Sequence, residues 1–179
     1  MPLTFRTLLA AILSLSLMAC GFHLRGQGPN AKPLFASAQV IGNGGTGQEL
    51  SKLLTLLKVN LTSQNPEIKI QIVSETSDKQ VLSVNNNGQV AEYRIYYRIR
   101  FSAFKAGETL LDDNVLTLQR NLSWDESSVL SKESEEANLI KEMQRDGASQ
   151  MIRRINSAAK KNQTANTPAA SSASGVAAQ

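Results

Sequence analysis

The chain has 179 residues, and 19 Lys or Arg side chains against 15 Asp or Glu side chains give it a net charge of +4. This mild excess suits an anionic partner but lies far below the charge density of nucleic-acid-binding domains, so no nucleic-acid partner is expected. With one cysteine, Cys20, and one histidine, His23, the chain can form no internal disulfide and has no His or Cys cluster with the spacing of metal ligands.

The N-terminal segment has the layout of an export signal. A single positive charge, Arg6, precedes an apolar stretch over 8–18, which is shorter than the roughly 20 residues of a permanent membrane span. The stretch ends in Leu-Met-Ala directly before Cys20 and resembles a lipobox, in which the cysteine thiol receives lipid and the preceding peptide is removed. The alternative is a secreted protein whose cysteine merely lies near the cleavage site; the leucine and the small alanine favour the lipobox.

This interpretation predicts where the chain works. Residues 1–19 would be a signal peptide, and covalent acyl chains on Cys20 would anchor the chain to a membrane surface. No other cofactor is expected. Lipoproteins of this kind that stay in the inner membrane carry Asp after the cysteine, so Gly21 indicates the inner leaflet of the outer membrane.

The rest of the chain divides into three segments. Residues 20–36, rich in Gly and polar residues, read as the lipidated N-terminus and a tether, and residues 37–159 are enough for one domain with a hydrophobic core. Residues 160–179 are rich in Ala, Ser and Thr and cannot bury enough apolar surface to fold, so we expect a disordered tail.

The first part of the domain predicts a strand and a helix. A short apolar run over 38–41 is followed by a glycine-rich breaker over 42–45, which we interpret as a flexible connection. Thr46 and Glu49 have the spacing of a capping box at a helix start. A helix ending before Pro66 would place five leucines on one face: Leu50, Leu53, Leu54, Leu57 and Leu61.

The middle of the domain predicts an antiparallel meander. Isoleucines alternate with polar residues over 68–72, and the Asn-Gly pair at 87–88 favours a hairpin turn. The following strand, over 91–103, places alternate apolar residues on one face and Glu92, Arg94, Tyr96, Arg98, Arg100 and Ser102 on the other. A turn over 106–108 leads to a third strand through 115–119.

The last element is a helix over 132–159, with an apolar stripe that includes Met143 and Met151 and with acidic residues at its start and basic residues at its end, as the helix dipole favours. The element order β-α-β-β-β-α predicts an α+β two-layer sandwich. In it, two helices pack on one face of a four-stranded mixed sheet.

The sequence shows no evident set of catalytic residues. His23 lies three residues from the lipidated cysteine, where a substrate pocket would be awkward to build. The adjacent carboxylates Asp112 and Asp113 would point to opposite faces of a strand, so a solvated pair is favoured over an acid–base pair. A hydrolase is therefore disfavoured, and no enzymatic activity is expected.

The strongest surface signal is the row Arg94, Arg98 and Arg100 on one face of a strand. Their even spacing brings three guanidinium groups within reach of one anionic surface, such as phosphorylated lipid or an acidic protein lining. The alternative is a solvated sheet face with scattered charges.

Three parts of the chain resemble the LptE family, the lipopolysaccharide-assembly lipoproteins of the outer membrane. Cys20 to Gly26 is similar to the start of the mature family members, and Asn87 to Tyr93 is similar to their central hairpin and following strand. Leu139 to Met143 and Met151 to Arg154 are similar to their C-terminal helix. The order and spacing of these segments carry the resemblance.

The resemblance implies a non-enzymatic role. Family members plug the large outer-membrane β-barrel protein LptD, assist its assembly, bind lipopolysaccharide and take part in its delivery to the outer leaflet. It further implies a lipid-contacting surface with basic residues in the hairpin and before the last helix. Lys132 matches the second position, whereas Asn85 and Asn86 stand where the hairpin would be basic, and Lys79 is a substitute candidate. The alternative function is a free-standing outer-membrane lipoprotein that binds or inhibits a periplasmic protein.

Overall fold

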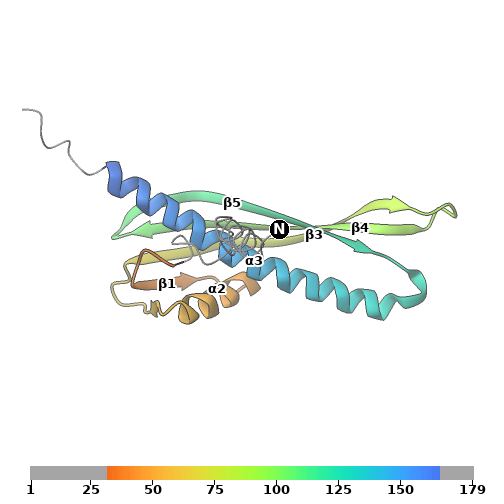
Figure 1. Ribbon diagram of the computed structural model, residues 1–179, viewed down its shortest axis with the longest axis horizontal. Helices are drawn as coiled ribbons and strands as arrows, with labels where there is room; N and C mark the ends of the chain where they lie inside the picture. The colour runs from red at the N-terminus through yellow and green to blue at the C-terminus, as the bar shows by residue number, and fades with distance from the viewer. Residues whose placement is uncertain (1–31, 166–179) are drawn as a thin grey trace, which may run out of the picture. The chain divides into compact units, whose positions relative to one another are not determined.

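The computed structural model describes residues 32–165, which form a five-stranded mixed sheet and two α-helices (Figure 1). The sheet order is β2-β1-β3-β4-β5. The elements are β1 (Ser37–Ile41), α2 (Gly45–Leu56), β2 (Asn60–Leu61), β3 (Ile68–Val84), β4 (Val90–Lys105), β5 (Glu108–Ser123), a short 3₁₀ turn (Glu126–Ser128) and α3 (Val129–Ala165). The predicted α+β class is confirmed, and the predicted meander is β3-β4-β5.

The fifth strand is β2, which the sequence pattern had assigned to the first helix. α2 ends at Leu56, and Lys58 adopts the left-handed backbone conformation (φ 62°), which turns the chain back along β1. Asn60 N then donates to Ala36 O at 2.9 Å in a parallel pairing. Leu61 therefore lies in β2, and the prediction that it continues the leucine face of the helix is wrong.

Both hairpin turns contain a glycine at positive φ. Gly88 (φ 79°) closes the β3–β4 turn, in which Asn85 N donates to Gln89 O at 2.8 Å. Ala106 and Gly107 (φ 51° and 86°) form the two-residue β4–β5 turn, the type that matches the twist of paired strands.

One face of the sheet is covered by both helices, and the core lies between the two layers (Figure 1). The predicted alternation along β4 places its apolar residues inward. The largest fully buried side chains come from every layer: Leu50 and Leu54 of α2, Ile68 and Ile70 of β3, Ile95, Ile99 and Phe101 of β4, Leu116 and Leu122 of β5, and Met143, Met151 and Ile155 of α3. The two-layer arrangement is thus as predicted.

The start of α2 differs from the prediction. No side chain of the helix caps it; instead Glu75 of β3 accepts from Thr46 N at 3.0 Å, so the expected capping box is absent. The glycines before α2 are closely packed rather than a flexible connection, because a Cβ on Gly44 would lie 2.3 Å from the Glu75 carboxylate.

α3 is longer than predicted at both ends. It begins at Val129 and runs through residues 160–165, which were assigned to the tail. The acidic residues Glu133, Glu135 and Glu136 therefore lie beyond its first turn. The first turn has no acidic residue and the last turn has no basic residue, so the charges expected to interact favourably with the helix dipole are absent from both ends.

Ordered packing begins before the predicted domain boundary. Asn156 of α3 donates from Nδ2 to Lys32 O at 2.9 Å and accepts from Leu34 N at 3.0 Å, and Phe35 is buried. Cys20, His23 and residues 166–179 lie outside the described residues. Within residues 32–165, no helix is both long and apolar enough to cross a membrane.

Candidate functional site: two basic groups on opposite faces of the sheet

The three predicted arginines lie on the face of the sheet that the helices leave uncovered. Arg94, Arg98 and Arg100 alternate along β4 with the buried Ile95, Tyr97 and Ile99, so all three side chains point away from the core. We call these three residues the arginine face.

Each arginine is oriented by a neighbour on the same face. Arg94 Nε donates to Asn121 Oδ1 at 3.2 Å, and the Arg98 guanidinium lies 5.6 Å from the centroid of the Tyr96 ring. Arg100 Nε is 3.2 Å from Asp113 Oδ1 in an exposed ion pair. Asp113 is therefore a partner of an arginine.

The strands beside β4 continue this polar surface. The residues that pair with the three arginines are Ser74, Thr76 and Gln80 of β3 and Val115, Thr117 and Asn121 of β5. Only one of them is apolar. A surface of this kind can make many hydrogen bonds and hold anionic groups, but it offers no apolar area for a core.

A cleft of about 820 Å³ opens at the β1 end of the sheet. Its lining includes Gln39, Lys69, Gln71 and Phe104, all of which lie on strands. Lys69 and Phe104 are partners across β3 and β4, and Lys105 at its margin lies 3.9 Å from Glu67. The cleft is open, and its lining is mixed, with polar side chains beside Pro66 and Phe104.

Lys79 lies on the other face of the sheet, toward the helices. A β-bulge between Ile72 and Ser74 adds one residue to β3, so that the odd-numbered residues from Glu75 to Val81 point inward. Lys79 accordingly pairs with the buried Ile95 rather than with an arginine. The predicted contact set therefore divides into two groups.

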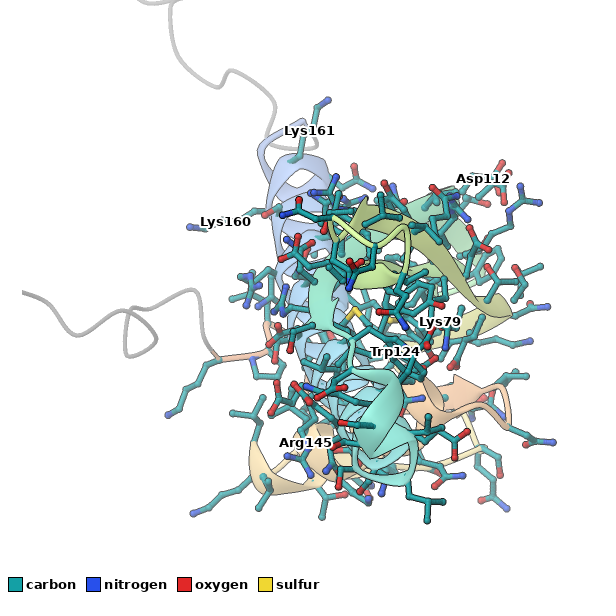
Figure 2. The ribbon with its side chains drawn as sticks, turned by 90° about the vertical axis from the view of Figure 1, so that its right-hand side faces the viewer. Lys79, Asp112, Trp124, Arg145, Lys160 and Lys161 are labelled. Carbon is teal, nitrogen blue, oxygen red and sulfur yellow. The ribbon has the colours of Figure 1, made fainter. Side chains whose placement is uncertain are left out.

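Lys79 is exposed, and its ammonium group contacts two aromatic rings and a carboxylate. Its Nζ lies 4.9 Å from the centroid of the Tyr93 ring and 5.0 Å from that of Trp124, and it is 2.7 Å from Glu136 Oε2. Figure 2 shows Lys79 beside Trp124. The two rings pack edge to face, with centroids 5.1 Å apart. The lysine thus joins the hairpin to α3.

Lys132 reaches the same end of the sheet from α3. Its Nζ donates to Ser123 Oγ and to Glu135 Oε2, both at 2.9 Å. Since Ser123 immediately precedes Trp124, Lys79 and Lys132 converge on one dipeptide at the end of β5. We call Lys79 and Lys132 the lysine pair.

Sequence reasoning missed the partners of the lysine pair. Trp124 is the chain's one tryptophan and lies before a helix, which marks it as a candidate contact. Lys132 and Glu135 have the i, i+3 spacing of a helical ion pair, which the sequence also shows. Asp125 follows Trp124 and accepts from Ser127, from both Oγ and N, which holds the pKa of the Asp125 carboxyl below its usual range.

A second polar cluster lies inside the fold. Tyr97 OH donates to Glu75 Oε2 at 2.5 Å and lies 3.1 Å from Thr46 Oγ1. Burial, followed by the hydrogen bond to Glu75, raises the pKa of the Tyr97 hydroxyl. Because these hydrogen bonds join Thr46 of α2 to Glu75 of β3 and Tyr97 of β4, the cluster serves the packing of α2 on the sheet.

Metal ligands are not gathered anywhere in residues 32–165: no three His, Cys, Asp or Glu side chains are placed to hold an ion together. The geometry therefore offers two groups of cations for anion binding, one on each side of the sheet.

Comparison with protein families gives a match over most of the described residues. The family model LptE, described as lipopolysaccharide-assembly, matches residues 36–155, which is most of the described part of the chain.

Three solved structures with a similar fold carry the name lipoprotein. The solution structure of an uncharacterized lipoprotein B from Nitrosomonas europaea is 25% identical, with a TM-score of 0.64 over 82% of this chain and 97% of that one. The crystal structure of the rare lipoprotein B from Shewanella oneidensis is 20% identical, with a TM-score of 0.58 over 73% and 96%. A minor lipoprotein from Acinetobacter baumannii is 20% identical, with a TM-score of 0.57 over 72% and 95%.

Proposed function

This chain belongs to the LptE family of lipopolysaccharide assembly, and we propose that it acts as an outer-membrane lipoprotein that plugs the LptD β-barrel. In this role it assists the assembly of the barrel, binds lipopolysaccharide and takes part in its delivery to the outer leaflet. Acyl chains on Cys20 would hold it at the inner leaflet of the outer membrane, facing the periplasm.

The uncovered sheet face is the observation that supports a plug best. The lumen of a transmembrane barrel is polar, so a plug needs a surface that makes hydrogen bonds and ion pairs. Arg94, Arg98 and Arg100, with the hydroxyl and amide side chains beside them, supply such a surface on a rigid sheet. The arginine face is therefore our candidate for contact with the barrel wall.

The lysine pair is our candidate for contact with lipopolysaccharide. Ammonium groups bind phosphates as point charges, and the two lysines lie at the hairpin end of the sheet, beside an aromatic pair that can contact apolar groups. With this assignment the barrel would contact one face of the sheet and the lipid would contact the other.

Purification of the lipidated chain from outer membranes tests the plug. We expect the wild type to co-purify with the barrel protein, and the double variant R94E/R98E to lose it. R153E/K161E is the matched control, because Arg153 and Lys161 are exposed cations on α3 and their reversal changes the net charge by the same amount. Loss of the barrel from the control as well, or retention by the double variant, would refute the assignment of the arginine face.

The competing proposal is a free-standing lipoprotein that binds a periplasmic protein. It predicts that the purified wild type carries no barrel, and that depletion of the chain leaves lipopolysaccharide export intact. A hydrolytic role is not proposed, because Asp113 is engaged with Arg100. The variant D112N/D113N should therefore retain the activity of the wild type in export.

A further inference from the structure

We propose that the lysine pair is a phosphate site masked by the chain's own carboxylates, Glu135 and Glu136, which an incoming phosphate group displaces. The inference rests on the proposed binding of lipopolysaccharide and adds how that binding is regulated.

The two carboxylates occupy the positions that phosphate oxygens would take. Glu136 Oε2 lies 2.7 Å from Lys79 Nζ, and Glu135 Oε2 lies 2.9 Å from Lys132 Nζ. These are the distances of charge-assisted hydrogen bonds from an ammonium to an anionic oxygen. Each lysine therefore carries one anion already, and the two anions are consecutive residues of one helix.

The remainder of the site does not depend on the carboxylates. Lys79 is also held by the rings of Tyr93 and Trp124, and Lys132 is also held by Ser123 Oγ. When the glutamates leave, both ammonium groups keep a neutral support near their present positions. A phosphate would then meet a site that is already organised.

The helical segment that carries the mask lies before the part of α3 that packs on the core. None of the side chains from Val129 to Asn138 is buried, and the first core contacts of α3 are made by the partly buried Leu139 and Ile140. Leu130 is 83% exposed. Rotation of the two glutamates, or a small shift of this segment, opens no cavity in the core, so the mask can be removed at little cost.

Partly exposed ion pairs are weak, and this sets the size of the effect. Removing one such pair changes an equilibrium by up to about fivefold. A mask of this strength lowers the affinity for a single phosphate only moderately. A lipid with two phosphates, which displaces both carboxylates, gains more than a single phosphate does.

Titration of the full lipidated chain in detergent micelles tests the mask, with the fluorescence of Trp124 as the readout. Trp124 contacts Lys79 and is the chain's one tryptophan, so displacement at Lys79 changes its environment. E136Q and E135Q should each bind lipopolysaccharide about two- to fivefold more tightly than the wild type, whereas K79Q and K132Q should bind more weakly.

E133Q is the matched control, because Glu133 carries the same charge on the same exposed part of α3 and contacts neither lysine among the interactions of the described residues. It should bind as the wild type does. A gain in E133Q equal to that in E136Q would mean that only net charge matters, and would overturn the mask.

The outcomes separate the mask from the proposed function. If the wild type binds lipopolysaccharide through both lysines, but E135Q and E136Q bind equally or more weakly, the mask is wrong and the lipid site stands. If no variant binds lipopolysaccharide, both fail. Inorganic phosphate serves as a second probe that identifies the natural ligand. If E136Q binds inorganic phosphate more tightly than the wild type does, but binds lipopolysaccharide equally well, the masked site is a site for free phosphate.

Discussion

Tyr97 of β4 and Glu75 of β3 share a hydrogen bond of 2.5 Å between the hydroxyl group and Oε2, and the same oxygen accepts from Thr46 N at the start of α2. One carboxylate thus joins two strands and a helix. It stands where the positive end of the helix dipole favours a negative charge.

E75A should lower the free energy of unfolding by about 1–3 kcal/mol, because it leaves the Tyr97 hydroxyl and the Thr46 amide without their acceptor. Urea unfolding at neutral pH measures the loss. E108A is the control, since Glu108 is exposed in the turn region that begins β5. Equal stability of the two variants would contradict the role of Glu75.

The raised pKa of Tyr97 predicts an alkaline loss of stability. The ordinary pKa of the phenol is 10.0, and the folded protein shifts it upward by burial and by the bond to Glu75. Deprotonation is then favoured in the unfolded chain, so the contribution of Tyr97 is present below pH 10 and decreases as the pH rises through its folded pKa.

Y97F isolates this effect from other titrating groups. At neutral pH the variant should be less stable by about 1–2 kcal/mol, because Glu75 and Thr46 lose a partner. As the pH rises above about 10, the difference in unfolding free energy between wild type and variant should shrink. Parallel stability curves at all pH values would show that the hydroxyl does not couple to folding.

The parts of the fold that depend on residues close together in the sequence could be predicted. The alternation along 91–103 predicted which side of β4 enters the core, because neighbouring residues alone determine it. Leu61 was misassigned because its spacing still fits a helix, whereas the chain turns back at Lys58 to pair with β1. That pairing is a tertiary interaction, and leucine periodicity does not report it.

The candidate site was predictable only in part, for a related reason. The arginine face follows from spacing along a single strand. The position of Lys79 depends on the bulge after Ile72, which reverses the side of the sheet that later residues of β3 face. Without the bulge, Lys79 would lie among the arginines; with it, the lysine reaches Trp124.

G47A tests the close approach of α2 to the preceding loop. A Cβ at Gly47 would lie 2.7 Å from the carbonyl oxygen of Gly42, a backbone atom with little freedom to move. Alanine favours a helix over glycine by about 1 kcal/mol, but the forced shift costs about 1–3 kcal/mol, so we expect a net loss of stability. Thermal unfolding measures it, with Q48A on the exposed side of the same helix as control.

W124A should release the first part of α3 from the hairpin. The variant removes the edge-to-face contact with Tyr93 and one ring of the pair that holds Lys79, which together contribute about 1–2 kcal/mol. Before Leu139 and Ile140, which pack against the core, this segment is held to the sheet mainly by the contacts of Lys79 and Lys132, whereas the segment from Met143 onward is held by the core.

Hydrogen exchange followed by mass spectrometry should therefore show, for W124A, faster exchange in peptides from residues 129–138 and unchanged exchange in peptides from residues 143–159. L130A is the control, since the Leu130 side chain is exposed on the same segment and its loss should change neither region. Faster exchange throughout α3 would instead mean that Trp124 supports the whole helix, and that the segment carrying Glu135 and Glu136 does not move independently of the core.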